Sequence, residues 1–358
     1  MKTTLRYIVF LFISVVALLE IGLHIYNPFH FRIKGERIVL ETNKKYTIDN
    51  SRIPVLDPQV NHTRNELGFR GPAKPTDAAK HISIIAIGGS TTECFYLDDS
   101  KTWPQLLYQR LKDSVPGLWL NNAGLAGHST HAHSMLLKEH IIPLRPDVVL
   151  LLTGANDIRR EKADGASNKL LSFFSDHSQL YNLVTNLRRF REAEKRNLTD
   201  TYIDPKKADS LVLSDDYINN YLSNESMWVN AYTSRLQSII HTCRANNITP
   251  ILVTQPSMVG KGIDPISGVS LETIKLNDRE NGKLWWMMLE KYNEGTRAVA
   301  RTNNIPLIDL ALELPKSSEY FYDIVHFTNA GASRTAAIIY DSLLPLLQRG
   351  LFASGDNR

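Results

Sequence analysis

The sequence predicts an α/β protein whose strands form a doubly wound parallel sheet. Short β-branched and apolar runs alternate along the chain with longer amphipathic segments, which is the pattern of strands joined by crossover helices. The run from Ile82 to Ile87 is rich in isoleucine, so we expect a strand that is buried on both faces. It stops at Gly88 and Gly89, which permit a tight turn into a helix. Because ligands of such sheets bind at the carboxyl ends of the strands, functional residues are expected there.

The same alternation predicts the other elements in order. Thr102 is a suitable N-cap with Pro104 in the following turn, so a helix is expected to begin there. Asp147 opens the most strand-like run of the chain, which ends at Thr153. Further strands are expected at residues 118–122, 250–254 and 306–310, and helices at 102–113, 129–144, 180–195, 228–246, 282–302 and 329–347.

The N-terminus carries an apolar stretch, residues 7–26, which is long enough to span a bilayer as a helix and is interrupted only by Glu20. The rival interpretation is a cleaved signal peptide with its apolar core at residues 7–19. No small-x-small cleavage site follows, so we favour an uncleaved single-pass anchor. Basic residues flank both ends, but the short tail of residues 1–6 favours a cytoplasmic N-terminus and an extracytoplasmic body.

The rest of the chain divides by composition into an arm, one large domain and a tail. The arm is polar and proline-containing and is expected to pack on the body, whereas the domain carries two long segments of weak periodicity that we interpret as insertions. The expected boundaries are 27–80 for the arm, 81–348 for the catalytic domain with insertions at 158–225 and 255–280, and 349–358 for the tail.

Composition excludes several classes of function. Lys and Arg number 41 against 37 Asp and Glu, a net charge of +4, which is too small to indicate a nucleic-acid partner. The two cysteines form neither a disulfide framework nor a metal motif. Four histidines lie close together, but no carboxylate or cysteine accompanies them at a known ligand spacing, so we expect them to line a cleft or the surface rather than bind a metal. They are His128, His131, His133 and His140.

The ends of the predicted strands carry residues suited to acyl transfer. Ser90 follows the first strand, and a serine attacks an acyl carbonyl only when a base removes its proton. His326, in the loop before the last helix, has a suitable pKa for that role, and Asp323 is placed to hold its imidazole. The alternative that Ser90 merely caps a helix loses weight because the other strand ends match it. A phosphate-binding loop is not favoured, because the Lys of that motif is absent.

Three groups are candidates for stabilising an oxyanion. They are the N–H of Ser90, the N–H of Gly124 after the second strand, and the side-chain amide of Asn156 after the third. Each of the latter two has a plainer interpretation as a turn residue.

The sequence segments around these residues resemble the four sequence blocks of the SGNH/GDSL hydrolase family. They are Gly-Gly-Ser90-Thr, Asn-Ala-Gly124, Gly-Ala-Asn156-Asp and Asp323-x-x-His326, over residues 82–345. The chain departs from the family at Gly89, where many members have Asp. The resemblance implies a flavodoxin-like sheet of order 2-1-3-4-5 with helices on both faces, and ester hydrolysis without a metal or other cofactor.

The predicted function is that of a membrane-anchored serine esterase. The polar insertions indicate a short acyl group, most simply acetyl, on a small molecule or an exported carbohydrate, with Tyr217, Tyr221 and Trp228 as candidates for stacking on sugar rings. The alternatives are an O-acyltransferase acting on a glycan, a lysophospholipase or lipid esterase, and a non-catalytic glycan-binding relative. Leu170, Leu171, Phe173 and Phe174 keep the lipid alternative open. The basic helix near residues 180–195 is expected to have a solvated face rather than to touch a membrane.

Overall fold

The structure is a computed structural model of the chain. It describes residues 2–26, 33–34, 37–77, 80–160, 173–174, 177–195 and 201–349. The chain divides into two compact units, residues 1–40 with 165–199 and residues 41–164 with 200–358. The predicted arm and the first predicted insertion therefore each contribute residues to both units.

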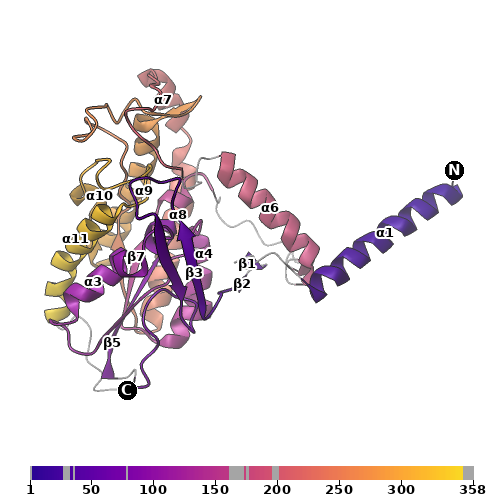
Figure 1. Cartoon of the computed structure of the whole chain (residues 1–358), viewed down its shortest axis with the longest axis horizontal. Helices are drawn as coiled ribbons and strands as arrows, with labels where there is room; N and C mark the ends of the chain where they lie inside the picture. Colours follow the sequence, from indigo (N-terminus) through magenta and orange to yellow (C-terminus); the bar gives the residue numbers. More distant parts are fainter. Residues whose placement is uncertain are drawn as a thin grey trace. The chain divides into compact units, whose positions relative to one another are not determined.

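The larger unit contains a five-stranded parallel sheet (Figure 1). Its strands run in the spatial order β11-β8-β7-β5-β6, which is 2-1-3-4-5 when they are numbered along the chain, as predicted. All neighbouring strands pair in parallel. The strands are β5 (Ile82–Gly88), β6 (Leu118–Asn122), β7 (Val148–Leu152), β8 (Thr249–Val253) and β11 (Leu307–Ile308).

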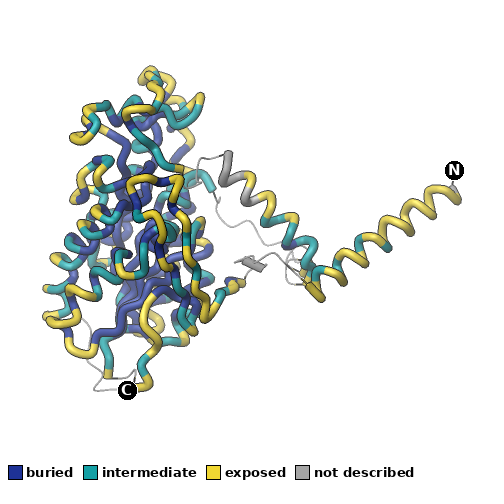
Figure 2. Tube along the Cα trace, viewed as in Figure 1, coloured by how far each residue is buried: buried dark blue, intermediate teal, exposed yellow. Residues whose placement is uncertain are grey.

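Two groups of helices cover the sheet. In one group α3 (Trp103–Leu111) contacts α11 (Asn329–Gln348) and β6, and in the other α8 (Glu225–Ala245) contacts both α4 (Thr130–Leu136) and α9 (Gly282–Asn303). Right-handed crossovers place the two groups on opposite faces. The core follows the sheet, because β7 at its centre and the edge strand β6 are buried along their whole length (Figure 2).

The helices begin largely where the sequence predicts. The side chain of Thr102 accepts a hydrogen bond from the backbone N–H of Gln105 at the start of α3. The α-helical part of α4 is shorter than the predicted 129–144, because the chain continues as π-helix over Leu137–Ile141 and as 3-10 helix over Ile142–Leu144. Pro143 has no N–H to donate to a regular helical ladder, which accounts for the change of geometry.

The arm forms a hairpin that the sequence did not predict. Strands β3 (Lys44–Asp49) and β4 (Gln59–Arg64) pair in antiparallel fashion. The hairpin is joined to the rest of the larger unit by Asp98 and Asp99, whose carboxylates accept the backbone N–H groups of Asn61 and Thr63. Beyond the hairpin, Arg70 makes an antiparallel bridge with Asn122 at the end of the edge strand β6.

The described parts of the two insertions join one another. The N–H of Leu211 donates to the carbonyl of Thr273 at 2.8 Å, and the N–H of Lys275 donates to the carbonyl of Asp209 at 2.8 Å. The first insertion contributes α7 (Asp215–Leu222), and the second contributes β9 (Lys275–Asn277) and β10 (Glu280–Asn281). The first insertion follows β7 and the second follows β8, so these hydrogen bonds join two segments that leave neighbouring strands.

The smaller unit contains two long helices, α1 (Lys2–Ile25) and α6 (Gln179–Lys195), and a short pair of strands, β1 (Ile33–Lys34) and β2 (Arg37–Ile38). Residues 3–25 of α1 are long and apolar enough to cross a membrane, a test that a signal sequence also meets. The carboxylate of Glu20 accepts hydrogen bonds from the N–H groups of Gln179 and Leu180, at 2.6 and 3.1 Å, and from the hydroxyl of Ser178. It thereby satisfies backbone donors at the start of α6.

Candidate active site

The end of β5 places Ser90 at the first position of a short helix, α2 (Ser90–Glu93). A side chain at Gly88 would overlap the side chain of Thr92 and the carbonyl of Leu152, so the turn closes directly over the strand ends. A side chain at Gly89 would overlap the amide nitrogen of Asn156. The two glycines therefore let the serine sit against two neighbouring strand ends.

Ser90, His326 and Asp323 form a continuous chain of hydrogen bonds. The Nε2 atom of His326 lies 2.6 Å from the hydroxyl of Ser90, and its Nδ1 atom lies 2.6 Å from Oδ2 of Asp323. A carboxylate only accepts hydrogen bonds, so Nδ1 carries the proton and Nε2 presents its lone pair to the serine hydroxyl. The arrangement has the order and tautomer that general-base activation of a serine requires.

The loop before α11 holds this histidine rigidly. The other carboxylate oxygen of Asp323 accepts the N–H groups of Val325 at 2.9 Å and His326 at 2.8 Å. The ring of Tyr322 stacks on the imidazole, with centroids 5.5 Å apart and planes 12° apart. Thr328 caps α11 by accepting the N–H of Gly331. Asp323 and His326 are both buried, so their geometry is fixed by the loop rather than by solvent.

Asn156 lies in the 3-10 turn Ala155–Asp157 that follows β7. Its amide nitrogen donates one hydrogen bond to the carbonyl of His128, at 3.1 Å, which leaves its second N–H for a ligand. The adjacent Asp157 is buried and accepts the N–H and the hydroxyl of Thr130. The turn is therefore anchored to the start of α4, and the amide stays beside Gly89.

Gly124 does not occupy the position that the sequence suggested. It is buried, and its N–H donates to the side-chain carbonyl of Asn122 at 2.9 Å. A side chain at Gly124 would overlap the backbone of Thr92 and Glu93, so glycine is required for packing against α2. The prediction that its N–H stabilises an oxyanion is corrected, because that donor is already used within the loop.

Three residues after Gly124, the backbone N–H of Gly127 has no hydrogen-bond acceptor among the described residues. The N–H groups of Ala123, Leu125, Ala126 and His128 all have acceptors, which are the carbonyls of Ala86, Gly88 and Leu125 and the carboxylate of Glu93. Gly127 is exposed, has φ +75° and makes no backbone N–H hydrogen bond to another described residue. The sequence offered one signal for it, a second glycine in the same loop, but not a way to choose between the two.

Other reactive side chains near the site are inert or lie elsewhere. Cys94 follows α2, and burial raises its thiol pKa to about 12, so it is not a competing nucleophile. It and Cys243 are both free thiols. His133 is buried, and burial lowers its pKa to about 4, so it is neutral at physiological pH. Among the residues that the structure describes, no group of three or more His, Cys, Asp or Glu side chains is arranged to hold a metal ion.

Asp264 fastens the second insertion to the loop that precedes His326. It is fully buried and accepts the N–H and hydroxyl of both Ser267 and Ser318. Burial raises the pKa of this carboxyl, but the hydrogen bonds from Ser267 and Ser318 outweigh that effect and hold it below its ordinary value of 3.8.

Replacement of Asp264 by asparagine is expected to lower the free energy of unfolding by about 2 kcal/mol at pH 7, because the amide cannot accept all four hydrogen bonds. The pKa of Asp264 is lower in the folded state than in the unfolded state. The difference in the free energy of unfolding between the wild type and the variant is therefore complete above the ordinary pKa of the carboxyl and is lost as the pH falls through its folded-state pKa. Urea unfolding of both proteins between pH 7 and pH 3 measures this difference in the free energy of unfolding. Asp278→Asn, at an exposed site in the same insertion, is the control and should leave the urea midpoint unchanged. An Asp264→Asn effect that is constant with pH would contradict this assignment.

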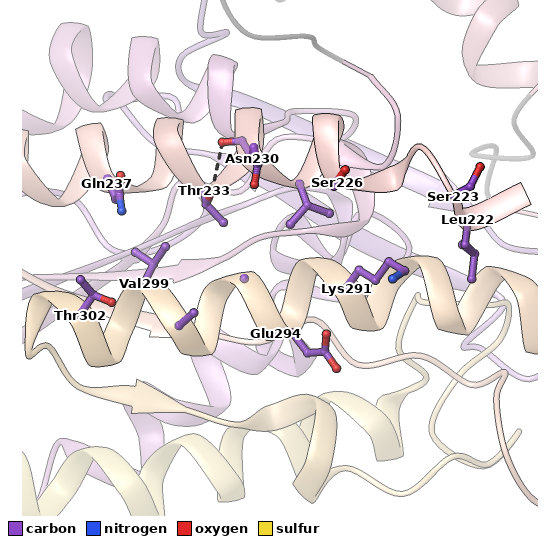
Figure 3. A pocket seen from close by; sticks show the side chains of 13 residues that line it. Leu222, Ser223, Ser226, Asn230, Thr233, Gln237, Lys291, Glu294, Val299 and Thr302 are labelled. Atoms are coloured by element: carbon purple, nitrogen blue, oxygen red, sulfur yellow. Dashed lines mark hydrogen bonds between the residues drawn. The ribbon is translucent and has the colours of Figure 1, made fainter. Parts of the chain in front are cut away.

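A groove of about 530 Å³ lies between α8 and α9, away from these residues (Figure 3). Ser226, Asn230 and Thr233 line it from α8, and Lys291 and Glu294 line it from α9. None of the strand-end residues contributes to it. The groove is therefore distinct from the candidate active site.

An α/β sheet with a serine, a histidine and an aspartate joined by hydrogen bonds at its carboxyl edge is an arrangement that occurs among hydrolases. The model of the GDSL-like lipase/acylhydrolase family matches residues 86–334, which is more than half of the chain. The chain belongs to this family, and it is an ester-hydrolysing enzyme. The departure at Gly89 does not remove it from the family.

Several solved structures are similar to the chain at low sequence identity. An acetyl xylan esterase, AlAXEase, is 17% identical, with 73% of this chain and 100% of that chain covered and a TM-score of 0.44. A mutant acetyl-xylooligosaccharide esterase from Geobacillus is 15% identical, with 73% and 93% covered and a TM-score of 0.43. The lipase/acylhydrolase from Enterococcus faecalis is 16% identical, with 74% and 95% covered and a TM-score of 0.42. The substrates named for those proteins are theirs alone. No curated protein matches the chain.

Proposed function

We propose that the chain is a serine esterase in which Ser90 is the nucleophile, His326 the general base and Asp323 the residue that orients the histidine. The observation that carries this assignment is the unbroken chain of two 2.6 Å hydrogen bonds from the Ser90 hydroxyl through the imidazole to the Asp323 carboxylate. Such a chain serves proton transfer, and no structural role requires a serine hydroxyl at its end.

The reaction proceeds in two stages on this geometry. The Ser90 oxygen attacks the ester carbonyl while its proton passes to Nε2 of His326, and the same proton then goes to the leaving alcohol. The resulting acyl-enzyme is attacked by water, whose proton passes to Nε2, and the carboxylic acid is released as Ser90 recovers its proton. The Asp323 carboxylate stabilises the imidazolium that exists between these transfers.

Three donors converge on the position where the carbonyl oxygen becomes negative in this proposal. The N–H of Ser90 lies at the start of a helix, where the first N–H groups have no intrahelical acceptor. The second N–H of the Asn156 amide supplies another donor, and the N–H of Gly127 takes the place first assigned to Gly124. Support for Gly127 comes from its exposure and from Arg160, whose guanidinium donates to the Gly127 carbonyl.

The substrate that we propose is a short acyl ester, most simply an acetyl group on an exported carbohydrate. The described parts of the two insertions contain side-chain hydrogen bonds, such as those from Ser267 to Asp264 and from Tyr221 to Glu280. Tyr221, one of the candidates for sugar stacking, donates to Glu280 and has the Arg159 guanidinium 4.1 Å from its ring centroid. One face of its ring is therefore occupied. Tyr217 is partly exposed and keeps the stacking role in this proposal.

A chain-length series of p-nitrophenyl esters tests the acyl preference. We expect kcat/KM to be highest for acetyl and to fall as the acyl chain grows, because a long chain needs apolar surface to cover it. Release of acetate from acetylated xylan, measured beside the series, tests the carbohydrate. A ten-fold preference for decanoyl over acetyl would overturn this choice of substrate.

The runner-up is an esterase of lysophospholipids or fatty esters. The observation that favours it is the exposure of Ile263 and Ile266, two large apolar side chains in the second insertion. Phe173 and Phe174 are also exposed, whereas Leu170 and Leu171 lie outside the described residues. Transfer of the acyl group to a glycan hydroxyl uses the same acyl-enzyme and is distinguished by whether an added glycan acquires the acetyl group.

We also propose that α1 stays on the mature protein as a membrane anchor, with the esterase body on the extracytoplasmic side. The support is the contact of Glu20 with the start of α6, because removal of a signal peptide would take away the carboxylate that satisfies the N–H groups of Gln179 and Leu180. An acidic residue inside an apolar helix is costly unless it has partners, and these donors are such partners.

Retention of α1 predicts that the mature protein sediments with membranes and resists extraction by alkaline carbonate. Alkaline phosphatase fused after residue 358 should be active, which reports an extracytoplasmic position. Determination of the mature N-terminus by mass spectrometry decides between anchor and signal peptide. A mature chain that begins after residue 26 would contradict the anchor.

A further inference from the structure

Glu93 is a buried carboxylate on the same helical turn as Ser90. It is fully buried at the last position of α2, three residues after the nucleophile. A buried charge is costly unless it is paired and hydrogen-bonded, so its partners must account for its presence. The proposed mechanism gives it no chemical step.

The two oxygens of Glu93 connect two distant segments. One oxygen pairs with the guanidinium of Arg64, which is 7% exposed and ends strand β4 of the arm. The other accepts the backbone N–H of Ala126 at 2.5 Å. Ala126 directly precedes Gly127, so the carboxylate fixes the residue before the proposed oxyanion donor.

A second arginine from the arm closes the end of α2. Arg70 is buried and donates to the carbonyls of Glu93, Cys94 and Leu97, at 2.7, 2.6 and 2.8 Å. The last carbonyls of a short helix have no intrahelical donors, so Arg70 supplies them. Its charge is balanced by Asp99 at 2.7 Å.

The loop after β6 is tied to α2 by side-chain amides as well. Asn122 donates to the carbonyl of Thr92 at 2.7 Å and accepts the N–H of Gly124. The nucleophile turn and the loop of Gly127 thus share one hydrogen-bonded network. Both arginines lie before residue 86, where the match to the family begins.

We propose that Arg64 and Glu93 are a positioning pair that holds the Ala126–Gly127 backbone at the oxyanion, so that the arm is a working part of the active site. This inference rests on the proposed function, because it assigns the pair to the oxyanion side of that mechanism. An oxyanion donor acts mainly in the transition state, so its displacement lowers kcat and leaves KM nearly unchanged.

The test compares Arg64→Met, Glu93→Gln and the double variant in the full-length protein. Each single change leaves one buried charge unpaired, whereas the double variant leaves none. We expect kcat for p-nitrophenyl acetate to fall by about ten- to a hundred-fold in each single variant, with KM within about two-fold, and to recover in part in the double variant. Arg52→Met removes an exposed arginine from the same arm and should retain wild-type kcat.

Amide hydrogen exchange gives a readout that does not depend on catalysis. Peptides covering residues 122–128 should take up deuterium faster in the single variants, while those covering β7 stay protected. If Arg64→Met does not fold, Arg64→Lys carries the test, because it keeps the charge but loses the forked geometry, and a smaller fall in kcat is expected. Unchanged kcat together with unchanged exchange in residues 122–128 would overturn the inference. Failure of the proposed function would show instead as full activity in Ser90→Ala, and the exchange result would still decide the role of the pair.

Discussion

Ser90→Ala is expected to lower kcat/KM for p-nitrophenyl acetate by about 10⁴-fold or more, because the variant lacks the hydroxyl that lies 2.6 Å from Nε2 of His326 and that we propose attacks the carbonyl. The fold should persist, since Ser90 is only partly buried and the loss of one hydroxyl leaves α2 with its other contacts. The measurement is steady-state hydrolysis with purified protein, accompanied by thermal unfolding to show that the variant is folded.

His326→Ala is expected to cost nearly as much, and the double variant little more than either single one. The two side chains act as a unit, so removing the base from a serine or the serine from a base disables the same step. Additive losses, or full activity in purified Ser90→Ala, would refute the assigned nucleophile and base.

Asn156→Ala is expected to lower kcat by about 10²- to 10³-fold with little change in KM, because the amide stabilises charge that develops only in the transition state. Asn156→Asp keeps the shape, cannot donate and places a negative charge beside the oxyanion, so its kcat should be lower still. These variants are compared by saturation kinetics on the same short ester.

If Asn156 had only a structural role, the variants would change the melting temperature rather than kcat. Its amide also donates to the carbonyl of His128, and loss of that contact alone would lower the melting temperature without a selective fall in kcat. A rise in KM at constant kcat would place Asn156 in substrate binding instead.

The sheet and the proximity of Ser90, His326 and Asp323 could be predicted because their signals are local and strong. The apolar run of β7 is continuous and that of β5 is interrupted only by Ser83, and each strand leads through a turn to a polar side chain. Parallel pairing then brings Ser90, Asn156 and the Asp323–His326 loop to one edge of the sheet. The three-residue spacing of Asp323 and His326 permits the turn that the structure shows.

The choice between Gly124 and Gly127 could not be made from the sequence. Both glycines lie in the same loop, and the difference arises because the Asn122 side chain turns back to accept the Gly124 N–H. That is a side-chain conformation, and no periodicity in the sequence reports it. The two glycines differ in whether the backbone N–H already has an acceptor in the folded loop, and the structure rather than the sequence shows this.

The contact between Arg64 of the arm and Glu93 was not predicted, for a different reason. Arg64 is 29 residues from Glu93, and their contact depends on a hairpin whose polar sequence does not resemble a buried strand. Arginine in a polar, proline-containing segment is ordinarily solvated. Pairings of this kind follow from the assembled fold rather than from local sequence.

Covalent labelling with a p-nitrophenyl phosphonate ester identifies the nucleophile directly. The phosphonyl group mimics the tetrahedral intermediate and stays on the nucleophile, so peptide mass spectrometry locates it. If Ser90 is the nucleophile, a single adduct forms on Ser90 in step with the loss of esterase activity. We expect no adduct in His326→Ala under the same conditions, because the serine then lacks its base. Inactivation with the adduct on another residue, or continued hydrolysis by a protein that is fully modified at Ser90, would contradict it.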